Sequence, residues 1–597
     1  MKILLSILSI LSIVVLAGCA AVPPRPADIA RGDYASVQEY VKKLIRHEMD
    51  KNAVAGLSIA VVDDQQIVWA EGFGYADRER EIPATAETLY RVGSITKLFT
   101  ATAAMQLAEQ GRLDIDRPLK DYLPDFTIRS RFPGAAPITP RQLMTHHAGL
   151  PRDRAKGFMN PDPRPFDLLT EDIRDDDLAY PPGQVFSYSN LGVTLLGGAI
   201  QRVSGRPYAE HMRQSVLAPL GMANSSFDTG LSPSPFMARG YRGKDAAAEP
   251  PLRDVPAGGL NTNVIDLSRF ISMVFAGGSS GSHRVLQPQS LAEMLRPQNA
   301  DVPLDLNFHI GLGWMLSILG ASAIENAGPE AHHSGATAFF RSQLRILPEH
   351  KLGIVVVANS STAGQVVDHV ATEALALALE AKTGIRQPKR DKPRFRDEPL
   401  PAATVEDVIG AYTTLAGFAR LYANGNVLRA DAVGHTFNLI PRSDGLLGLD
   451  YTLLGIVRLD LGSLGELGFS RQRVGGHDLL IARIGSQEMA VGERIERPVD
   501  LGAWRHRLGD YQINNLDRDH EFVEHIRLIE EDGFLLVEMT MAGPPEQTLC
   551  LPLMPLSDGE ALLLSGLATG GETVRRVVVD GEERLAISGY LLKRVAP

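Results

Sequence analysis

One stretch constrains the fold more than any other: R-V-G-S-I-T-K-L-F-T at 91–100, which leads into an apolar segment that stops at Gly111. From Leu98 to Leu107 the residues are apolar or small on most faces of the helix that this segment predicts. A helix of this kind must be buried in a core, and Gly111 supplies its stop signal. Ser94 then lies in the first turn of a buried helix, where backbone N–H groups have no intrahelical partner.

Ser94 and Lys97 are one helical turn apart and therefore share a face. Burying an unpaired ammonium costs free energy, so a lysine at this position needs a chemical reason. Desolvation disfavours the charged form of lysine, and a neutral amine can take the proton of a serine hydroxyl, which is otherwise a poor nucleophile. S-x-x-K alone is a weak pattern, because an N-cap serine followed by a surface lysine has the same spacing.

The amino terminus has the features of an export signal. Residues 3–17 form an apolar run that is too short to span a bilayer comfortably, and L-A-G-C follows, ending at Cys19. This box resembles that of bacterial lipoproteins, in which the cysteine is lipidated. We expect a signal peptide over 1–19, a tether over 20–34 and a lipid anchor on Cys19. The alternative is an ordinary signal peptide cleaved near Ala20 or Ala21.

The residue after Cys19 is Ala20 and not the aspartate that signals retention in the inner membrane. The expected location is the cell envelope, lipid-anchored, in the outer membrane facing the periplasm of a Gram-negative bacterium.

Composition excludes several function classes. Lys and Arg number 60 against 71 Asp and Glu, a net charge of -11, which argues against a nucleic-acid binder. The other cysteine is Cys550, so a lipidated Cys19 leaves no intrachain disulfide. The histidine pairs at 146–147 and 332–333 are adjacent rather than one turn apart, and no phosphate-binding loop is present. We therefore expect no metal and no cofactor.

Further motifs follow S-x-x-K in a fixed order. They are T-H-x-x-G-L-P at 145–151, P-G-x-x-F-x-Y-S-N at 182–190, A-G-G-L at 257–260 and H-S-G at 333–335. Together they resemble the serine β-lactamase and penicillin-binding-protein family in its class C-like branch, which carries S-x-x-K, then Y-x-N, then K-T-G or H-x-G. The resemblance covers 35–385.

The resemblance implies an α+β fold, in which a mostly antiparallel sheet is covered by helices and flanked by a helical lobe. It also implies a serine hydrolase that forms an acyl-enzyme. Ser94 would be the nucleophile, Lys97 and Tyr188 would share proton transfer, and Asn190 would hold the substrate amide and the lysine. The N–H groups of Ser94 and Ala336 would form the oxyanion hole. The implied substrate-binding residues are Asn190, His333, Gly335 and Ala336.

One departure from the family pattern concerns substrate choice. The third motif has His333 where β-lactamases have a lysine that helps to bind the drug carboxylate. A histidine is a weaker, pH-dependent cation. Family members with histidine here are often esterases or peptidases, D-aminopeptidases among them. We expect the His333 side chain to face the bound acyl or leaving group and β-lactamase activity to be weak.

The carboxy-terminal third predicts β structure. After a charged, proline-rich linker at 386–402, short apolar runs alternate with turn residues, as in antiparallel barrels. I-G-A-Y at 409–412 is echoed by L-G-D-Y at 508–511. We expect two β-barrel modules, 403–497 and 498–597; the alternative is one large β domain. Paired barrels of this kind accompany D-aminopeptidase-like members of the family.

Three functions remain open at this point. The leading one is a lipid-anchored serine hydrolase acting on small amides and peptides, of D-aminopeptidase or carboxypeptidase type, or on esters. The second is a β-lactamase, or a penicillin-binding sensor that is acylated without turnover. The third is a non-catalytic envelope scaffold, against which the intact serine, lysine, tyrosine and asparagine argue. The expected partner is a small-molecule or peptide substrate, and the oligomeric state is open. The charged stretch 152–180 is long for a loop, which indicates a functional surface loop or lid.

Overall fold

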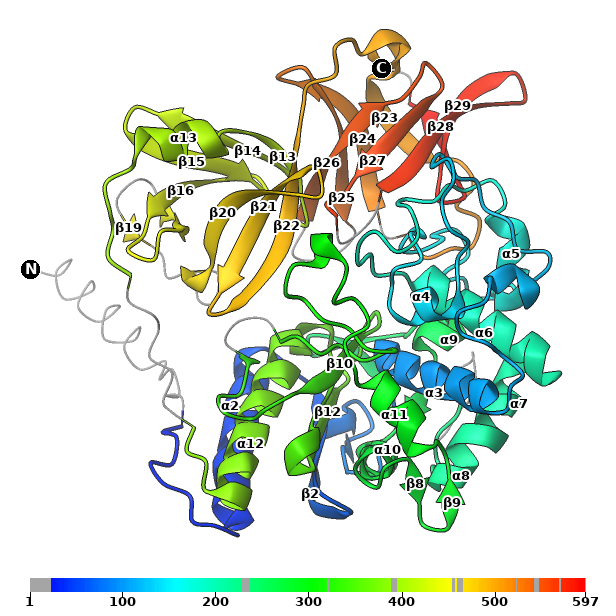
Figure 1. The fold of residues 1–597 in the computed structure, drawn as a ribbon, viewed down its shortest axis with the longest axis vertical. Helices are drawn as coiled ribbons and strands as arrows, with labels where there is room; N and C mark the ends of the chain where they lie inside the picture. Colours follow the sequence, from blue (N-terminus) through cyan, green and yellow to red (C-terminus); the bar gives the residue numbers. More distant parts are fainter. Residues whose placement is uncertain are drawn as a thin grey trace, which may run out of the picture.

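The structure is a computed structural model with three bodies, one hydrolase-like domain and two barrels (Figure 1). The barrels, in yellow and in orange to red, lie side by side above the domain, which runs from blue to green. Cys19 and the rest of the expected signal peptide lie outside the described residues. The structure describes residues 23–227, 236–318, 322–387, 395–453, 457–458, 465–521, 523–541, 547–567 and 571–595.

The hydrolase-like domain is built on an antiparallel sheet, which among the described residues has six strands in the order β10-β11-β12-β1-β2-β3. The central strands β1 and β12 are buried along nearly their whole length, because helices cover both faces of the sheet. The strands are β1 (Gly56–Asp63), β2 (Gln66–Asp77), β3 (Ile82–Pro83), β10 (Ala331–Ala336), β11 (Arg341–Leu347) and β12 (Leu352–Ala358).

Helices cover the two faces of this sheet in two separate cores. α2 and α12 pack on one face, and α10 packs on the other, where the helical lobe continues around α3 (Figure 1). The predicted α+β fold is therefore confirmed. The helices are α2 (Tyr34–Lys51), α3 (Thr96–Glu109), α4 (Pro140–Met144), α5 (Leu169–Asp172), α6 (Asn190–Ser204), α7 (Tyr208–Met212), α8 (Ala218–Leu220), α9 (Val255–Gly258), α10 (Val264–Phe275), α11 (Pro288–Met294) and α12 (Gly364–Thr383).

Two closed antiparallel barrels follow the domain, so the prediction of two modules is confirmed and the alternative of one large β domain is wrong. Apolar side chains fill the interior of each barrel. After α13 (Ala402–Val408), the first barrel consists of β13 (Gly410–Thr414), β14 (Gly417–Asn424), β15 (Val427–Ala432), β16 (His435–Pro441), β17 (Leu447–Asp450), β20 (Gly468–Val474), β21 (His477–Ile484) and β22 (Gln487–Ile495). The second consists of β23 (Gly509–Ile513), β24 (Val523–Glu531), β25 (Phe534–Met541), β26 (Gln547–Pro555), β27 (Glu560–Leu564), β28 (Gly571–Val579), β29 (Glu582–Ile587) and β30 (Tyr590–Arg594).

The sequence repeat has the same structural role in both barrels. Its tyrosine is buried at the first strand and donates its hydroxyl to the carbonyl four residues earlier. Tyr412 donates to Val408 at 2.8 Å, and Tyr511 donates to Arg507 at 2.6 Å. Each tyrosine thereby ties the short helical turn before the barrel to its first strand.

The barrels are joined to the hydrolase-like domain by polar and apolar contacts. Val185 and Leu304 of the domain form one apolar cluster with Leu479 of the first barrel and Leu567 of the second. The side-chain amide of Asn307 donates to the Ser486 carbonyl at 2.6 Å and accepts from the Glu488 N–H at 2.8 Å.

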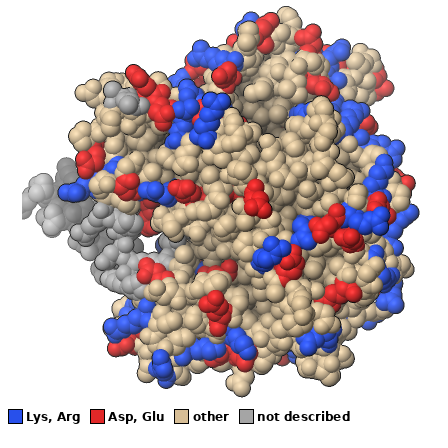
Figure 2. Space-filling model, viewed as in Figure 1, with Lys and Arg blue, Asp and Glu red and all other residues tan. Residues whose placement is uncertain are grey.

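Acidic and basic side chains are interspersed on the face shown in Figure 2, and neither charge predominates there. In the part of the chain that the structure describes, no helix is both long and apolar enough to cross a bilayer. Cys550 is a free, half-buried thiol on β26.

Candidate active site

Ser94 is placed at a cleft by the way its helix begins. A single 3₁₀ turn, Gly93–Ile95, leads directly into α3. Every residue from Arg91 to Leu107 is buried except Ser94, which is partly exposed. The buried helix predicted from the apolar run therefore fixes the serine hydroxyl at the one point of this segment that a substrate can reach.

Lys97 is buried next to Ser94 and has three hydrogen-bond acceptors. Its Nζ lies 3.0 Å from Ser94 Oγ, 2.7 Å from Asn190 Oδ1 and 2.8 Å from the Ala257 carbonyl oxygen. All three acceptors are neutral, and among the described residues no carboxylate pairs with the amine. Burial lowers the pKa of Lys97 to about 7, although the negative charge of Asp153 opposes this shift. Near neutral pH a large fraction of Lys97 is therefore a free amine within reach of the serine proton.

Tyr188 lies on the other side of the serine. Its ring stacks on His146 with 4.2 Å between ring centroids, and Lys97 Nζ lies 4.9 Å from the Tyr188 ring centroid. Burial raises the pKa of the Tyr188 phenol above its ordinary value, and a hydrogen bond with Ser94 lowers it by less. The phenol therefore stays protonated and can donate or relay a proton rather than act as a standing base.

The start of α6 positions the Y-x-N motif. Ser189 caps this helix by accepting from the Gly192 N–H, while its own N–H donates to His146 Nδ1 at 3.1 Å. Asn190 Nδ2 donates to Asp153 Oδ1 at 2.8 Å. Because the donor end of this amide faces a carboxylate, its oxygen faces Lys97, and the orientation of the amide is determined.

His146 lies just after the end of α4 and has a left-handed backbone conformation. His146 has a φ of 60°, a left-handed conformation that is uncommon for residues other than glycine. The helix before it begins with a capping box, in which Thr139 and Gln142 satisfy each other's backbone N–H groups.

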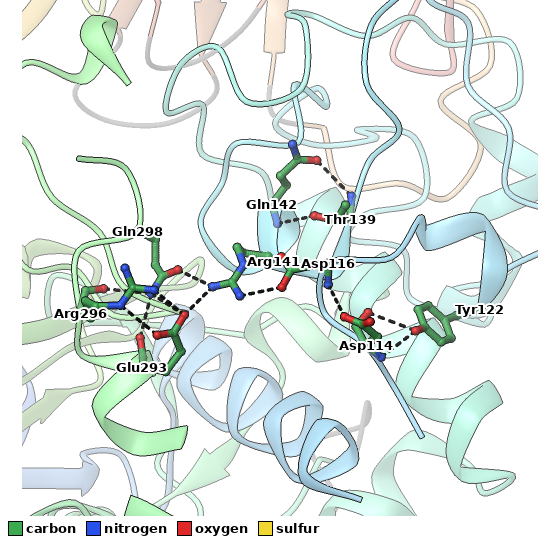
Figure 3. Close-up of polar contacts among 9 residues, drawn as sticks. All are labelled: Asp114, Asp116, Tyr122, Thr139, Arg141, Gln142, Glu293, Arg296 and Gln298. Atoms are coloured by element: carbon green, nitrogen blue, oxygen red, sulfur yellow. Dashed lines mark hydrogen bonds and ion pairs between the residues drawn. The ribbon is translucent and has the colours of Figure 1, made fainter. Parts of the chain in front are cut away.

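Arg141 anchors this short helix to two other parts of the lobe, as Figure 3 shows. Its guanidinium pairs with both carboxylate oxygens of Asp116, at 2.6 and 2.8 Å, and with Glu293 at 2.7 Å. It also donates to Gln298 Oε1 at 2.5 Å. A bidentate guanidinium pair is geometrically specific, so it fixes the helix from which His146 follows.

The third motif, on β10, packs closely against the backbone of the turn that carries Ser94. A Cβ on Gly335 would lie 1.9 Å from the Val92 carbonyl oxygen, so only glycine allows β10 to approach the turn that carries Ser94 this closely. A Cβ on Gly93 would lie 2.8 Å from the Ala336 nitrogen. Ala336 therefore lies directly against the turn that carries Ser94. The backbone N–H groups of these two residues are the pair predicted to form the oxyanion hole.

His333 lines the cleft as a neutral imidazole. Burial, and next the charge of Lys97, lower its pKa to about 3. Its ring centroid is 6.4 Å from that of Tyr188, and its Nε2 has no hydrogen-bond partner within the described part of the chain. This position therefore does not supply the permanent positive charge of a lysine.

The cleft has a volume of about 670 Å³ and is lined by side chains that the sequence analysis did not single out. For Arg152, Asp153, Phe158 and Met159 the sequence signal was the length and charge of the stretch 152–180, and Phe186 belongs to the motif at 182–190. Among them Arg152 lies over the Tyr188 ring, with 5.2 Å from its Cζ to the ring centroid. The additional lining residues include Arg152, Asp153, Phe158, Met159, Phe186, Glu249, Asp254 and Phe308.

The segment 153–160 joins this cleft to the second barrel. On the barrel side, the Ala155 N–H donates to Ser588 Oγ at 2.9 Å, and the Gly157 N–H donates to Asp519 Oδ2 at 2.8 Å. On the cleft side, Arg253 donates to the Arg154 carbonyl at 2.8 Å. The barrel does not line the cleft, but it holds the segment that does.

In the described ranges, no group of three or more His, Cys, Asp or Glu side chains has a geometry that could hold a metal ion.

Comparison with known protein families gives one match over most of the hydrolase-like domain. A family model described as Beta-lactamase matches residues 41–379.

Two curated relatives match parts of the chain. Protein flp of Staphylococcus aureus (strain N315) is 29% identical over 348 residues, which is 56% of this chain and 66% of that protein, slightly less than two thirds of its length. Beta-lactamase-like protein 2 of Dictyostelium discoideum is 30% identical over 214 residues, or 34% of this chain and 39% of that protein.

Two solved structures share the fold over most of the chain. The octameric penicillin-binding protein homologue from Pyrococcus abyssi has a TM-score of 0.51 at 24% identity, covering 77% of this chain and 99% of that one. SurE has a TM-score of 0.55 at 23% identity, covering 77% of this chain and 100% of that one.

Proposed function

Because the chain belongs to the beta-lactamase family, a family of serine hydrolases, we propose that it hydrolyses small acyl compounds through an acyl-enzyme on Ser94. One observation carries the proposal: Lys97 Nζ lies 3.0 Å from Ser94 Oγ in a site that lowers the lysine pKa to about 7. A base with this pKa matches the task of activating a serine near neutral pH.

The proposed reaction has two halves. The Ser94 oxygen bonds to the acyl carbon while its proton passes to Lys97. As the C–N or C–O bond to the leaving group breaks, the leaving group takes up that proton, and the protonated Tyr188 hydroxyl provides the path. Water then attacks the acyl carbon and gives a proton to Lys97. The bond between the acyl carbon and the Ser94 oxygen breaks, the acid leaves, and Lys97 returns the proton to the Ser94 oxygen, which restores both residues.

Charge developing on the acyl oxygen needs donors in fixed positions. The backbone N–H groups of Ser94 and Ala336 are the proposed pair, and the packing of Gly335 on the Val92 carbonyl supports this assignment. Asn190 holds Lys97 through Oδ1 at 2.7 Å.

We propose small amides and peptides, of D-aminopeptidase or carboxypeptidase type, or esters as substrates. The neutral His333 supports this choice over carboxylate-bearing β-lactams. A structure of the neighbour SurE was determined with D-Leu, at 23% identity to this chain. The alternatives, a β-lactamase or a sensor that is acylated without turnover, differ from this proposal in measurable ways.

We also propose that lipidated Cys19 holds the protein at the membrane of the cell envelope. The L-A-G-C box after a short apolar run supports this.

The deciding experiment is a hydrolysis panel of D- and L-aminoacyl amides, short acyl esters and a chromogenic cephalosporin, with Ser94→Ala as the control. Steady release of product from amides or esters supports the proposal, whereas a burst that stalls indicates a sensor. Fastest turnover of the cephalosporin indicates a β-lactamase. Turnover by Ser94→Ala, or labelling of that variant by a fluorophosphonate, would place the nucleophile elsewhere.

A further inference from the structure

Three carboxylates line the cleft, and they differ in whether a substrate can reach them. Asp254 is fully buried and pairs with Arg253 at 2.6 Å. Glu249 is buried and accepts from the Phe339 N–H at 2.9 Å. The Asp153 side chain, in contrast, is 25% exposed, and its Oδ2 lies 3.4 Å from Nε of Arg152, which is 49% exposed. Of these three carboxylates lining the cleft, Asp153 is the most accessible to a substrate.

Asp153 is close to the reacting serine through a short chain of contacts. Lys97 Nζ lies 3.0 Å from Ser94 Oγ, Asn190 bonds to the same Nζ at 2.7 Å, and Asp153 Oδ1 accepts from Asn190 at 2.8 Å. A substituent on the carbon next to a carbonyl bound at Ser94 is one or two bonds away from the reacting atom. Ser94, Asn190 and Asp153 line the same cleft, so Asp153 borders the space that such a substituent would enter.

The charges around Asp153 favour a cation over an anion. Asp254 interacts electrostatically with Asp153. Glu572 of the second barrel does so as well, but burial raises the pKa of Glu572 to about 7, so it carries only part of a negative charge near neutral pH. The facing cations are Lys97, whose pKa of about 7 leaves it partly neutral, and Arg152, whose guanidinium lies over the Tyr188 ring. An anionic substituent at this point would be repelled by Asp153 itself, and Asp254 adds to that repulsion.

We propose that Asp153 is a binding subsite for an ammonium group on the acyl part of the substrate, on the carbon next to the scissile carbonyl. The preferred acyl donors are then aminoacyl amides or esters. This inference rests on the proposed acyl-enzyme chemistry at Ser94. The ammonium donates a charge-assisted hydrogen bond to Oδ2 and shares the carboxylate with the long contact from Arg152.

The test compares p-nitroanilides with three different acyl groups. These are alanyl, as separate D and L forms, propionyl and succinyl. The variant is Asp153→Asn, which removes the charge and keeps an oxygen that can accept from Asn190. The matched control is Asp162→Asn, which removes an exposed carboxylate that lies in the same stretch, 152–180, but does not line the cleft.

The readout is the ratio of kcat/KM for alanyl to that for propionyl, because any effect of the variant on Lys97 acts on both substrates and cancels. We expect a ratio of about ten or more in the wild type and in Asp162→Asn, falling to near one in Asp153→Asn. A ratio that Asp153→Asn leaves unchanged overturns the subsite, as does a wild-type preference for the succinyl substrate, which would assign anion binding to Arg152. Turnover of propionyl in these cases keeps the hydrolase proposal intact, whereas no turnover of any substrate overturns both.

Discussion

Asp153 and Asn190 are joined by a hydrogen bond of 2.8 Å between residues 37 positions apart, and this bond determines which end of the Asn190 amide faces Lys97. The amide oxygen accepts from Lys97 at 2.7 Å. Lys97 is thereby oriented by a carboxylate that it does not touch, and the same carboxylate raises the lysine pKa against the effect of burial. Asp153, a side chain outside the three family motifs, therefore influences both the orientation of Asn190 and the pKa of Lys97.

The first prediction concerns the pH dependence of acylation. Lys97 must be unprotonated to accept the Ser94 proton, so kcat/KM for an uncharged ester should rise with pH and reach half its maximum near pH 7. Asp153→Asn removes a charge that raises the Lys97 pKa, so the midpoint should move to lower pH. Stopped-flow acylation between pH 5 and 9 measures both midpoints. A midpoint near the ordinary lysine value, or a shift to higher pH in the variant, would contradict the assignment of Lys97 as the base.

The second prediction concerns His333→Lys. A lysine at this position introduces a cation suited to carboxylate ligands, so kcat/KM for a cephalosporin should rise about tenfold relative to a neutral ester. The gain should grow as pH falls, because the burial that lowers the histidine pKa will also disfavour a charged lysine. His333→Gln, which adds no charge, is the control. An equal change in both variants would show that charge at this position does not select the substrate.

The third prediction tests whether the second barrel shapes the cleft. Gly589 has a φ of 87°, and a Cβ there would lie 2.8 Å from Lys156 Cβ and 2.9 Å from Arg154 Cζ. Gly589→Leu should displace segment 153–160 and lower kcat/KM for aminoacyl anilides several-fold, while a small fluorophosphonate still labels Ser94.

The control for this variant is Gly581→Leu in the neighbouring turn of the same barrel. Gly581 has a φ of 79° but no atom within 4 Å of the added Cβ, so the backbone strain is matched without the clash. Equal losses in the two variants would mean that barrel stability, not contact with the cleft segment, is responsible.

The fourth prediction concerns the proposed lipid anchor. Cys19→Ser removes the acylated thiol, so the protein should move from the membrane fraction to the soluble periplasmic fraction. Fractionation after a high-salt wash, followed by immunoblotting, measures the distribution. Cys550→Ser is the control and should stay with membranes. Sedimentation of Cys19→Ser with membranes would show a different mode of attachment.

Much of this site could be predicted because its parts are local. Ser94 and Lys97 are one turn apart, and Tyr188 and Asn190 flank the N-cap of one helix, so the spacing alone sets their relative positions. The α+β domain was implied by the family resemblance, and the two barrels were predicted from short apolar runs and from a repeat that retains one buried tyrosine per barrel. These features depend on short-range geometry, which the order of residues encodes directly.

What the tertiary structure decided is everything that depends on contacts between distant segments. Only the fold brings Asp153 to Asn190, lays Arg152 over Tyr188 and seats segment 153–160 on a barrel turn more than 400 residues later. Neither charge pattern nor spacing identifies such pairs, because many exposed aspartates and arginines have the same local sequence character. Burial determines their chemistry as well: it takes Lys97 and His333 out of water and so lowers both pKa values, and burial is a property of the packed chain.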